Sequence, residues 1–427
     1  MSPGNSSSPW RDGGAVTDVA GLAELYRDIH AHPELAFAEH RTAALVADRL
    51  RALGYDATTG VGGTGVVGLL ANGDGPTVLL RADMDALPVR ERTGLPYAST
   101  ASGTDRDGRE VPVMHACGHD MHVACLLGAA AELAAGAGSW RGTLQVVFQP
   151  AEETGEGARA MIGDGLFDRF GVPAVVLGQH VSPIPAGLLG LRAGPAFAAS
   201  DSLRVVLHGR GGHGSRPEAT VDPVVMAAST VLRLQTIVSR ETAPADSAVV
   251  TVGALHAGTK ENIIPDQAEL RLTVRTFEEP VRARTLAAIE RIVRAEAAAA
   301  AAPADPEITV TGSFPAVVND PAACARLTGA FAAGIGPGLV LDPGPVTGSE
   351  DVGELATAAG APCAYWLLGG ADPALFANVA SIAEARAIAG GLPSNHSPLF
   401  APVVEPTLRT GITALACAAR AWLAPSA

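Results

Sequence analysis

The sequence of 427 residues predicts an α/β protein of two domains, with the second domain inserted into the first. Three observations support this fold class. The chain is too long for one ordinary hydrophobic core. Its first part alternates helical stretches with short, almost wholly apolar runs, which is typical of a sheet covered by helices on both faces. Its middle part has the order β-α-β-β-α-β of a ferredoxin-like unit.

The first domain opens with residues 22–51, which are expected to be helical with an interruption near Pro33. Three strand-like runs follow, at residues 77–82, 143–148 and 174–178. They lead to side chains of ligand type, namely Asp83 and Asp85, then Glu152 and Glu153, then His180. Because ligands of α/β folds bind beyond the carboxyl ends of the strands, these side chains are expected at one edge of the sheet.

The domain boundaries can also be predicted. A disordered tail covers residues 1–15, the interrupted domain residues 16–196 and 315–427, and the inserted domain residues 197–314. Strands of the inserted domain are expected at 203–209, 248–255, 267–277 and 307–311, and its helices at 222–238 and 280–300. After it come a buried strand at residues 365–368 and a closing helix at residues 406–422.

Composition and charge exclude several classes of function. The sequence is 48% hydrophobic and 17% charged with a net charge of −14, so no broad attraction to nucleic acid or anionic lipid is expected. No stretch reaches the length of apolar residues that a membrane span needs, and the first residues lack the apolar core of a signal peptide. The 5 cysteines are odd in number and widely spread, which favours a reducing cytoplasm over a disulfide framework.

The strongest local signal is the run Met114–His122, which is dense in histidine and also holds a cysteine and an aspartate. Cys117 and His119 are two residues apart, so they can converge on one ion from a loop but not from a helix. The cluster is therefore expected on a loop that enters a helix near Met121, with Asp120 as the helix cap. The alternative is a buried thiol beside structural histidines.

The pair Glu152 and Glu153 is a second candidate site. Hydrolysis at a metal centre needs one carboxylate that holds a metal and another that moves protons. Adjacent residues can point to opposite sides, so one of the two can face an ion and the other the substrate. On its own such a pair is more often a solvated turn, but this one follows a strand of valine and phenylalanine.

Taken together, motifs from about residue 20 to residue 425 resemble the dinuclear metallo-amidohydrolases of the aminoacylase, hippurate hydrolase and auxin-conjugate hydrolase type. The motifs are Leu80–Pro88, Met114–His122, Phe148–Glu153, Gly209–Pro217, Glu261–Asp266, Gly348–Asp351 and Asn395–His396. The resemblance implies a zinc-peptidase-like α/β/α catalytic domain, interrupted by a lid or dimerisation domain. The wider clan has His-x-Asp at the first motif, whereas this sequence has Asp83-Met84-Asp85, as in the aminoacylase-like branch.

The resemblance also implies two divalent metal ions, zinc or manganese first, with cobalt or nickel as substitutes. The implied ligands are Cys117, His119, Glu153, His180 and His396. Glu152 would be the general base, and Asp85 a carboxylate that orients a ligating imidazole. Asp83, Asp120 and Glu350 receive no role from the resemblance.

Three residues of the inserted domain complete the implied site. His213, which lies between glycines, would stabilise the oxyanion of the reaction in an active site of the partner subunit. Asn262 and Arg275 would bind the substrate carboxylate. Plainer explanations stay open: His213 can be a turn histidine on a flexible loop, and Arg275 can pair with Glu269 or Glu278.

The predicted function is hydrolysis of the amide bond of an N-acyl amino acid or a similar small conjugate, by a cytoplasmic homodimer or higher homo-oligomer assembled through the inserted domain. A dipeptidase or carboxypeptidase on the same site is the first alternative. A hydrolase with Cys117 as nucleophile would explain neither the glutamate pair nor His396. A metal-binding protein without activity would gain nothing from the carboxylate of Glu152. No nucleic-acid or membrane partner is expected.

Overall fold

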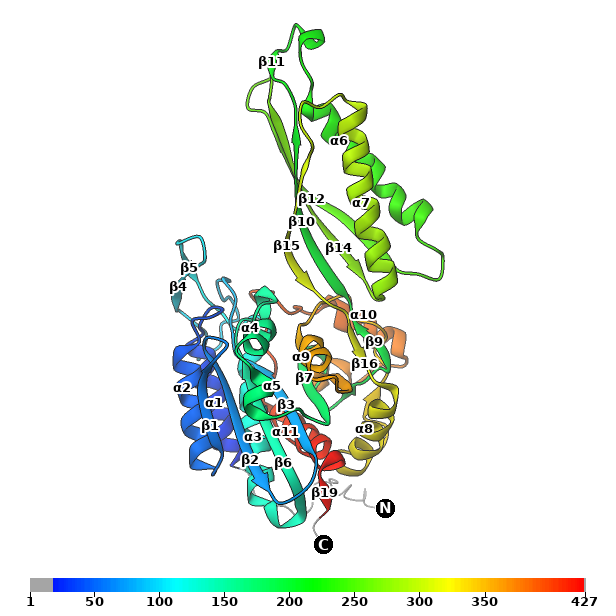
Figure 1. The fold of residues 1–427 in the computed structure, drawn as a ribbon. Coiled ribbons are helices and arrows are strands. Elements are labelled where there is room, and N and C mark those ends of the chain that lie inside the picture. Colours follow the sequence, from blue (N-terminus) through cyan, green and yellow to red (C-terminus); the bar gives the residue numbers. More distant parts are fainter. Residues whose placement is uncertain (1–17, 426–427) are drawn as a thin grey trace. The chain divides into compact units, whose positions relative to one another are not determined.

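The computed structural model describes residues 18–425 (Figure 1). The predicted tail at residues 1–15 therefore lies outside the described residues. The chain divides into two compact units. The first unit comprises the described residues up to Gly194, Val318–Gly344 and the described residues from Asp351 on, and the second comprises Pro195–Val317 and Pro345–Glu350.

The first unit contains the alternating helices and strands that the sequence predicts. Its helices are α1 (Val19–Ala31), α2 (His40–Ala52), α3 (His119–Ala135), α4 (Gly157–Gly163), α5 (Leu166–Phe170), α8 (Pro321–Gly334), α9 (Val352–Ala359), α10 (Ile382–Gly391) and α11 (Val404–Trp422). Its strands are β1 (Asp56–Val61), β2 (Gly65–Asn72), β3 (Thr77–Asp83), β4 (Ser102–Thr104), β5 (Glu110–Pro112), β6 (Trp140–Gln149), β7 (Val175–Pro185), β8 (Leu189–Gly190), β17 (Val340–Leu341), β18 (Cys363–Ala371) and β19 (Ala424–Pro425).

The large sheet of this unit is mixed. Its strand order is β1-β2-β6-β3-β7-β18-β8-β17, with β19 paired to β6. The neighbours β6, β3, β7 and β18 run parallel, whereas β1, β2 and β6 pair antiparallel. Four parallel strands at the centre bring their carboxyl ends to one edge, which is where α/β folds bind ligands.

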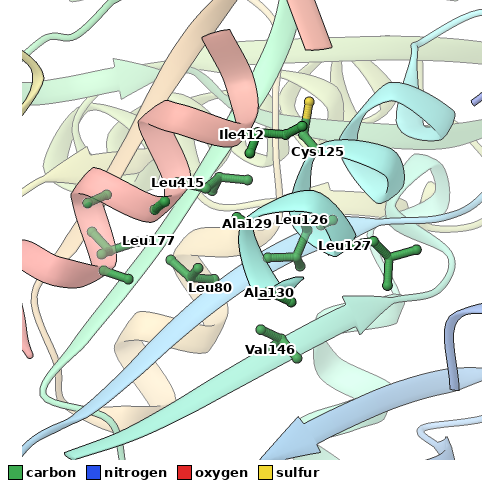
Figure 2. Close-up of a cluster of buried hydrophobic side chains, with 14 of the residues drawn as sticks. Leu80, Cys125, Leu126, Leu127, Ala129, Ala130, Val146, Leu177, Ile412 and Leu415 are labelled. Carbon is green, nitrogen blue, oxygen red and sulfur yellow. The ribbon is translucent and has the colours of Figure 1, made fainter. Parts of the chain in front are cut away.

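Side chains of the central strands alternate between the two faces of the sheet. Leu80 belongs to the main core, where it lies beneath residues of α3 and α11 (Figure 2). Its neighbour Arg81 points to the other face and donates to Asp351, the N-cap residue of α9. Helices therefore cover both faces, as the near-continuous apolar strands predict.

The contact between α3 and α11 depends on two glycines. A Cβ atom on Gly128 of α3 would come within 2.6 Å of Ile412, and one on Gly411 of α11 within 2.5 Å of the sulfur of Cys125. Only residues without a side chain allow the two helices to approach this closely. This packing holds α3 firmly over the sheet (Figure 2).

The second unit has the β-α-β-β-α-β order. Its elements are β10 (Ala199–His208), β11 (Gly212–His213), α6 (Pro223–Thr236), β12 (Ala248–Ala257), β13 (Ile263–Ile264), β14 (Gln267–Thr276), α7 (Glu279–Ala299) and β15 (Glu307–Phe314), while β9 (Gly194–Phe197) and β16 (Val317–Asn319) span the boundaries between units. The four long strands form an antiparallel sheet in the order β12-β14-β10-β15. Apolar side chains of β10, α6 and α7 share a separate core on one face of this sheet.

One local difference from the sequence prediction concerns a strand. The strand expected at residues 174–178 continues through His180 as far as Pro185, because it pairs along its length with β18. Among residues 18–425, no helix has the length and apolar character that a membrane crossing requires.

Candidate metal centre

The ligand-type side chains come from four segments at the carboxyl edge of the large sheet. Cys117 lies in the turn before α3, and His119 is the first residue of that helix. Glu153 lies in a one-turn 3-10 helix after β6, and His180 is within β7. His396 lies on a loop that is bonded to the turn before α3, because the backbone N–H of His396 donates to the carbonyl of Ala116 at 2.8 Å.

These side chains form two overlapping groups that share one thiol. Ligand atoms of Cys117, His119 and His180 lie within 4.8 Å of one another, and so do those of Cys117, Glu153 and His396. The sulfur of Cys117 is 3.5 Å from Nε2 of His180, and Oε2 of Glu153 is 3.3 Å from Nε2 of His396. Two triads with a common sulfur provide a donor set for two neighbouring cations.

The histidines present their Nε2 atoms to this cluster. Nδ1 of His119 donates to Asp85 at 3.2 Å, and Nδ1 of His180 donates to the carbonyl of Val181 at 2.8 Å. Such a bond on one ring nitrogen orients the other for ligation. Nε2 of His119 and Oε1 of Glu153 are buried and have no hydrogen-bond partner among the described residues. Buried, unpartnered nitrogen and oxygen atoms beside a thiol fit a divalent cation.

Negative charge concentrates around His119. Burial alone would lower the pKa of this imidazole, but Asp83 and Asp85 outweigh it and raise that pKa to about 10. Burial also raises the pKa of the Cys117 thiol, with Glu153 and Glu152 adding to the effect. Metal binding requires the deprotonated imidazole and thiolate, so these residues would release protons when cations bind.

Asp85 organises the glutamate turn. Its carboxylate accepts from the backbone N–H groups of Glu152 at 3.1 Å and Glu153 at 3.0 Å, in addition to His119. Glu152 is 4% exposed, and its Oε2 lies 3.8 Å from Nε2 of His119. Glu152 is in neither of these two triads, although its carboxylate also lies within 4.8 Å of ligand atoms of His119 and Glu153. It therefore borders the triads, which is where a proton-accepting carboxylate is useful.

Asp83 and His122 form a support behind the triads. The N–H of Val181 donates to Nε2 of His122, so the ring proton is on Nδ1 and donates to Asp83 at 2.5 Å. The ring of His122 packs 4.7 Å from that of His180 and 5.4 Å from that of His119. Asp83, whose role the sequence left open, thus contacts the imidazole that supports two of the predicted ligands.

The prediction that Asp120 caps α3 is wrong. The N-cap residue is Gly118, in the left-handed conformation, and it makes no side-chain cap bond. Asp120 instead lies inside the first turn, where its carboxylate accepts from Nδ1 of His30 at 2.6 Å. His30 also bonds Glu91 through Nε2 at 3.1 Å, so this buried histidine is flanked by two carboxylates. The ion pair links α1 to the start of α3, and long-range pairing of this kind is not visible in local spacing.

The comparison with protein families identifies the group to which this arrangement belongs. A model of peptidase family M20/M25/M40 matches residues 79–389. The chain belongs to peptidase family M20/M25/M40. This finding, together with the relatives described next, confirms the predicted resemblance and the α/β fold class.

Relatives within the family include enzymes with different named activities. Thermostable carboxypeptidase 1 of Saccharolobus solfataricus is 37% identical over 353 residues, which cover 82% of this chain and 85% of the relative. Hippurate hydrolase of Campylobacter jejuni is 44% identical over 282 residues, or 65% of this chain and 70% of the relative. The crystal structure of a dinuclear metal-binding M20 peptidase from Bacillus subtilis matches with a TM-score of 0.74 and 28% identity, over 95% of this chain and 99% of that one.

The other predicted site residues lie in the second unit of this M20/M25/M40 chain. His213 is on β11, which pairs with β13, and the N–H of Gly214 donates to the carbonyl of Asn262 at 2.9 Å. Arg275 is on β14, where its Nη1 donates to the carbonyl of Thr347 at 2.8 Å and to the hydroxyl of Ser349 at 3.0 Å. Among the described residues, Arg275 forms no ion pair with Glu269 or Glu278, the two alternatives; Glu269 instead pairs with Arg204 and Arg271. Glu350 is the buried last residue of this unit and stays unassigned.

Sequence reasoning missed a buried arginine beside the site. Arg81 donates to Asp83 at 2.6 Å, to Gln149 at 2.9 Å and to Asp351 at 2.9 Å. Burial alone would raise the pKa of Asp83, but His119, His122 and Arg81 lower it well below its usual range. The only sequence signal was the position of Arg81 in the motif that contains Asp83, since a buried arginine needs acidic partners.

Proposed function

We propose that this chain is a metal-dependent amidohydrolase that cleaves the amide bond of N-acyl amino acids, giving a carboxylic acid and a free amino acid. The observation that carries the proposal is the pair of triads sharing Cys117, with the carboxylate of Glu152 at their border. Hippurate, named for one relative, is itself an N-acyl amino acid, which supports this substrate class.

Two divalent ions would be held by Cys117, His119, Glu153, His180 and His396. The chemistry that such ions supply when bound is Lewis acidity toward the attacking water and the amide carbonyl. A relative with a dinuclear site supports the number of ions. Zinc or manganese is the proposed metal, with cobalt or nickel as substitutes, because thiolate, imidazole and carboxylate together suit these borderline ions.

The protein groups divide the remaining work. Glu152 accepts the proton of the attacking water and later delivers a proton to the leaving nitrogen. Asp85 keeps Glu152 and His119 in place through the three hydrogen bonds that it accepts. His213 donates a hydrogen bond to the oxyanion, in the active site of a partner subunit. Asn262 and the free side of the Arg275 fork bind the carboxylate of the substrate.

The proposed assembly is a homodimer or higher homo-oligomer formed through the second unit. The proposal depends on His213, which would need a neighbouring copy in order to act across subunits. The proposed compartment is the cytoplasm, which agrees with the 5 cysteines all being free thiols.

A carboxypeptidase or dipeptidase is the second candidate, and the name of the Saccharolobus relative favours it. A dipeptide has a free α-amino group that needs an acidic partner, and no described residue has been assigned to that task. A cysteine hydrolase is less well supported, because burial raises the pKa of the Cys117 thiol rather than lowering it.

The test is a panel of N-acyl amino acids, dipeptides and carboxypeptidase substrates, followed by mass spectrometry of the products with and without a chelator. Hydrolysis of the N-acyl amino acids, abolished by the chelator and restored by zinc or manganese, is the expected result. Preferential release of C-terminal residues from peptides would favour the second candidate. Activity that resists chelation but is lost on alkylation would overturn the metal mechanism.

A further inference from the structure

A buried glutamate that sequence reasoning did not single out lies directly behind the glutamate turn. Glu39 is the N-cap residue of α2 but makes no side-chain cap bond there. Its Oε1 accepts from the backbone N–H of Ala151 at 2.8 Å, and its Oε2 accepts from the hydroxyl of Thr64. The side chain is fully buried.

The position of Glu39 is unfavourable for a carboxyl group. Burial, with Asp85 as the neighbouring negative charge, raises its pKa to about 7. Burying a carboxylate next to a second carboxylate costs free energy, so we expect its hydrogen bonds to have a role that a smaller or apolar side chain could not fill. The contacts of Glu39 show what that is, because they end at the turn that carries Glu152.

Three consecutive amides of this turn are held by two carboxylates. Glu39 accepts from Ala151, and Asp85 accepts from Glu152 and Glu153. Ala151 has a φ of 50°, in the left-handed region that a non-glycine residue adopts only under constraint. Strained backbone of this kind persists where surrounding bonds over-determine it. The amide held by Glu39 belongs to the strained residue itself.

We propose that Glu39 is a positioning residue for Glu152: by holding Ala151 in the left-handed conformation, it sets the direction in which the general base leaves the backbone. The proposal rests on the role of Glu152 given under the proposed function. Glu39 touches no predicted metal ligand, so it acts on the base and not on the metals. Thr64 belongs to the same device, because its hydroxyl fixes the second carboxylate oxygen.

The experiment compares Glu39→Leu, Glu39→Gln and Thr64→Val in the metal-loaded protein. Glu39→Leu removes both hydrogen bonds, and kcat should fall on the order of 100-fold, the cost of a misplacement of about 1 Å. KM and the metal content should stay within about twofold of the wild-type values. Glu39→Gln keeps an acceptor for Ala151 and a partner for Thr64, so it should retain kcat within about threefold; Thr64→Val should fall between the two.

Glu34 offers a matched control on the same helix start. Its carboxylate accepts from the N–H groups of Arg41 and Thr42 at 2.8 Å but does not contact the glutamate turn. Glu34→Leu therefore also replaces a hydrogen-bonded carboxylate near the start of α2, but it does not release Ala151, and its kcat should match that of the wild type. An equal loss of kcat in both leucine variants, or a loss explained by missing metal or raised KM, would overturn the proposal.

A measurement without substrate separates this proposal from the proposed function. Amide hydrogen exchange across residues 151–155 should accelerate about tenfold or more in Glu39→Leu and stay unchanged in Glu34→Leu. If the wild-type protein hydrolyses none of the panel substrates, the proposed function fails, while exchange still reports on the turn. Unchanged exchange in Glu39→Leu overturns the positioning role even if the enzyme is active.

Discussion

The metal cluster of the first unit and the His213 loop of the second are built in opposite ways. In the first, His119 is fully buried and Cys117 is 6% exposed, and only His396 at the rim has a largely exposed side chain. Asp85 joins His119 to the glutamate turn, so distant segments are bound together. In the second, His213 is exposed, and within residues 18–425 its ring bonds only Ser215, two residues away, whose N–H and hydroxyl lie 3.1 and 2.8 Å from Nδ1. One region is assembled by the fold, and the other is held by its own loop.

The difference follows from the cost of burying polar groups. Charges removed from water must be paired, so each carboxylate in the first region has partners from distant parts of the chain. An exposed imidazole carries no such requirement, so its local surroundings say little about its role. Substitutions in the first region should therefore propagate through neighbours, whereas those in the second should act on one step of the reaction.

The largest effect is expected within the glutamate pair. Glu152→Gln should lower kcat by about 10²–10⁴-fold, because the base is lost, while both metal ions stay bound. Glu153→Gln should instead lose metal, since it removes a carboxylate from one triad. Metal analysis of both purified variants, together with kcat, checks the assignment. Equal metal loss in the two variants would mean that the roles of the pair are reversed.

The second effect tests whether the exposed region takes part in catalysis at all. His213→Ala should lower kcat by about 10²–10³-fold, the range for loss of one oxyanion donor, with metal content unchanged. Mixing His213→Ala with Glu152→Gln should restore part of the activity, because a hybrid dimer contains one site with both residues intact. Mass spectrometry would verify that the subunits have exchanged. If the mixture then shows no recovery of activity, action across subunits is excluded.

The third prediction concerns the free energy that it costs to keep the carboxyl group of Glu39 buried. The pKa of Glu39 is raised from 4.5 to about 7, so its stabilising contribution is present below pH 4.5 and is lost as the pH rises through 7. The loss is on the order of 3 kcal/mol of unfolding free energy. Glu39→Gln has no carboxyl group to titrate at this position. Between about pH 5 and about pH 8, its unfolding free energy in denaturant titrations should therefore rise relative to that of the wild type.

His213→Gln is the control for this pH series, because this substitution replaces one exposed polar side chain with another and leaves Glu39 in place. Its unfolding free energy should run parallel to that of the wild type over the same pH range. A difference between wild type and Glu39→Gln that is constant with pH would mean that Glu39 does not titrate in this interval.

Local sequence patterns predicted the elements of both units well, because periodicity and motif spacing depend on near neighbours. The helix interrupted near Pro33 is α1 and α2, and the turn before α3 has the place predicted for Cys117. Strand ends and short motifs singled out a wider set of acidic, histidine and cysteine residues, from which the family resemblance selected the five ligand candidates; the structure gathers these five in two triads. Whether they hold metal stays a prediction.

What the sequence could not reveal are pairings between distant residues. Glu39 meets Ala151 across 112 positions, and Asp120 meets His30 across 90. Neither contact leaves a local trace, so Glu39 was not considered and Asp120 was taken for a helix cap. The length of β7 was underestimated for the same reason, since it depends on pairing with β18 rather than on its own apolar run.

The smallest effect is expected from Ser215, and it tests how an exposed imidazole can be ready for catalysis. The N–H of Ser215 donates to Nδ1 of His213, which leaves the proton of the neutral ring on Nε2, where an oxyanion can accept it. Ser215→Ala removes the hydroxyl but keeps this N–H, so kcat should fall only about threefold with KM unchanged. Ser229→Ala, which removes an exposed hydroxyl bonded to Glu296 in the same unit, should leave both constants unchanged. If Ser215→Ala lowered kcat as much as His213→Ala does, the hydroxyl of Ser215, and not its backbone N–H, would orient the ring. The His213 loop would then depend on side-chain partners, as the metal cluster does.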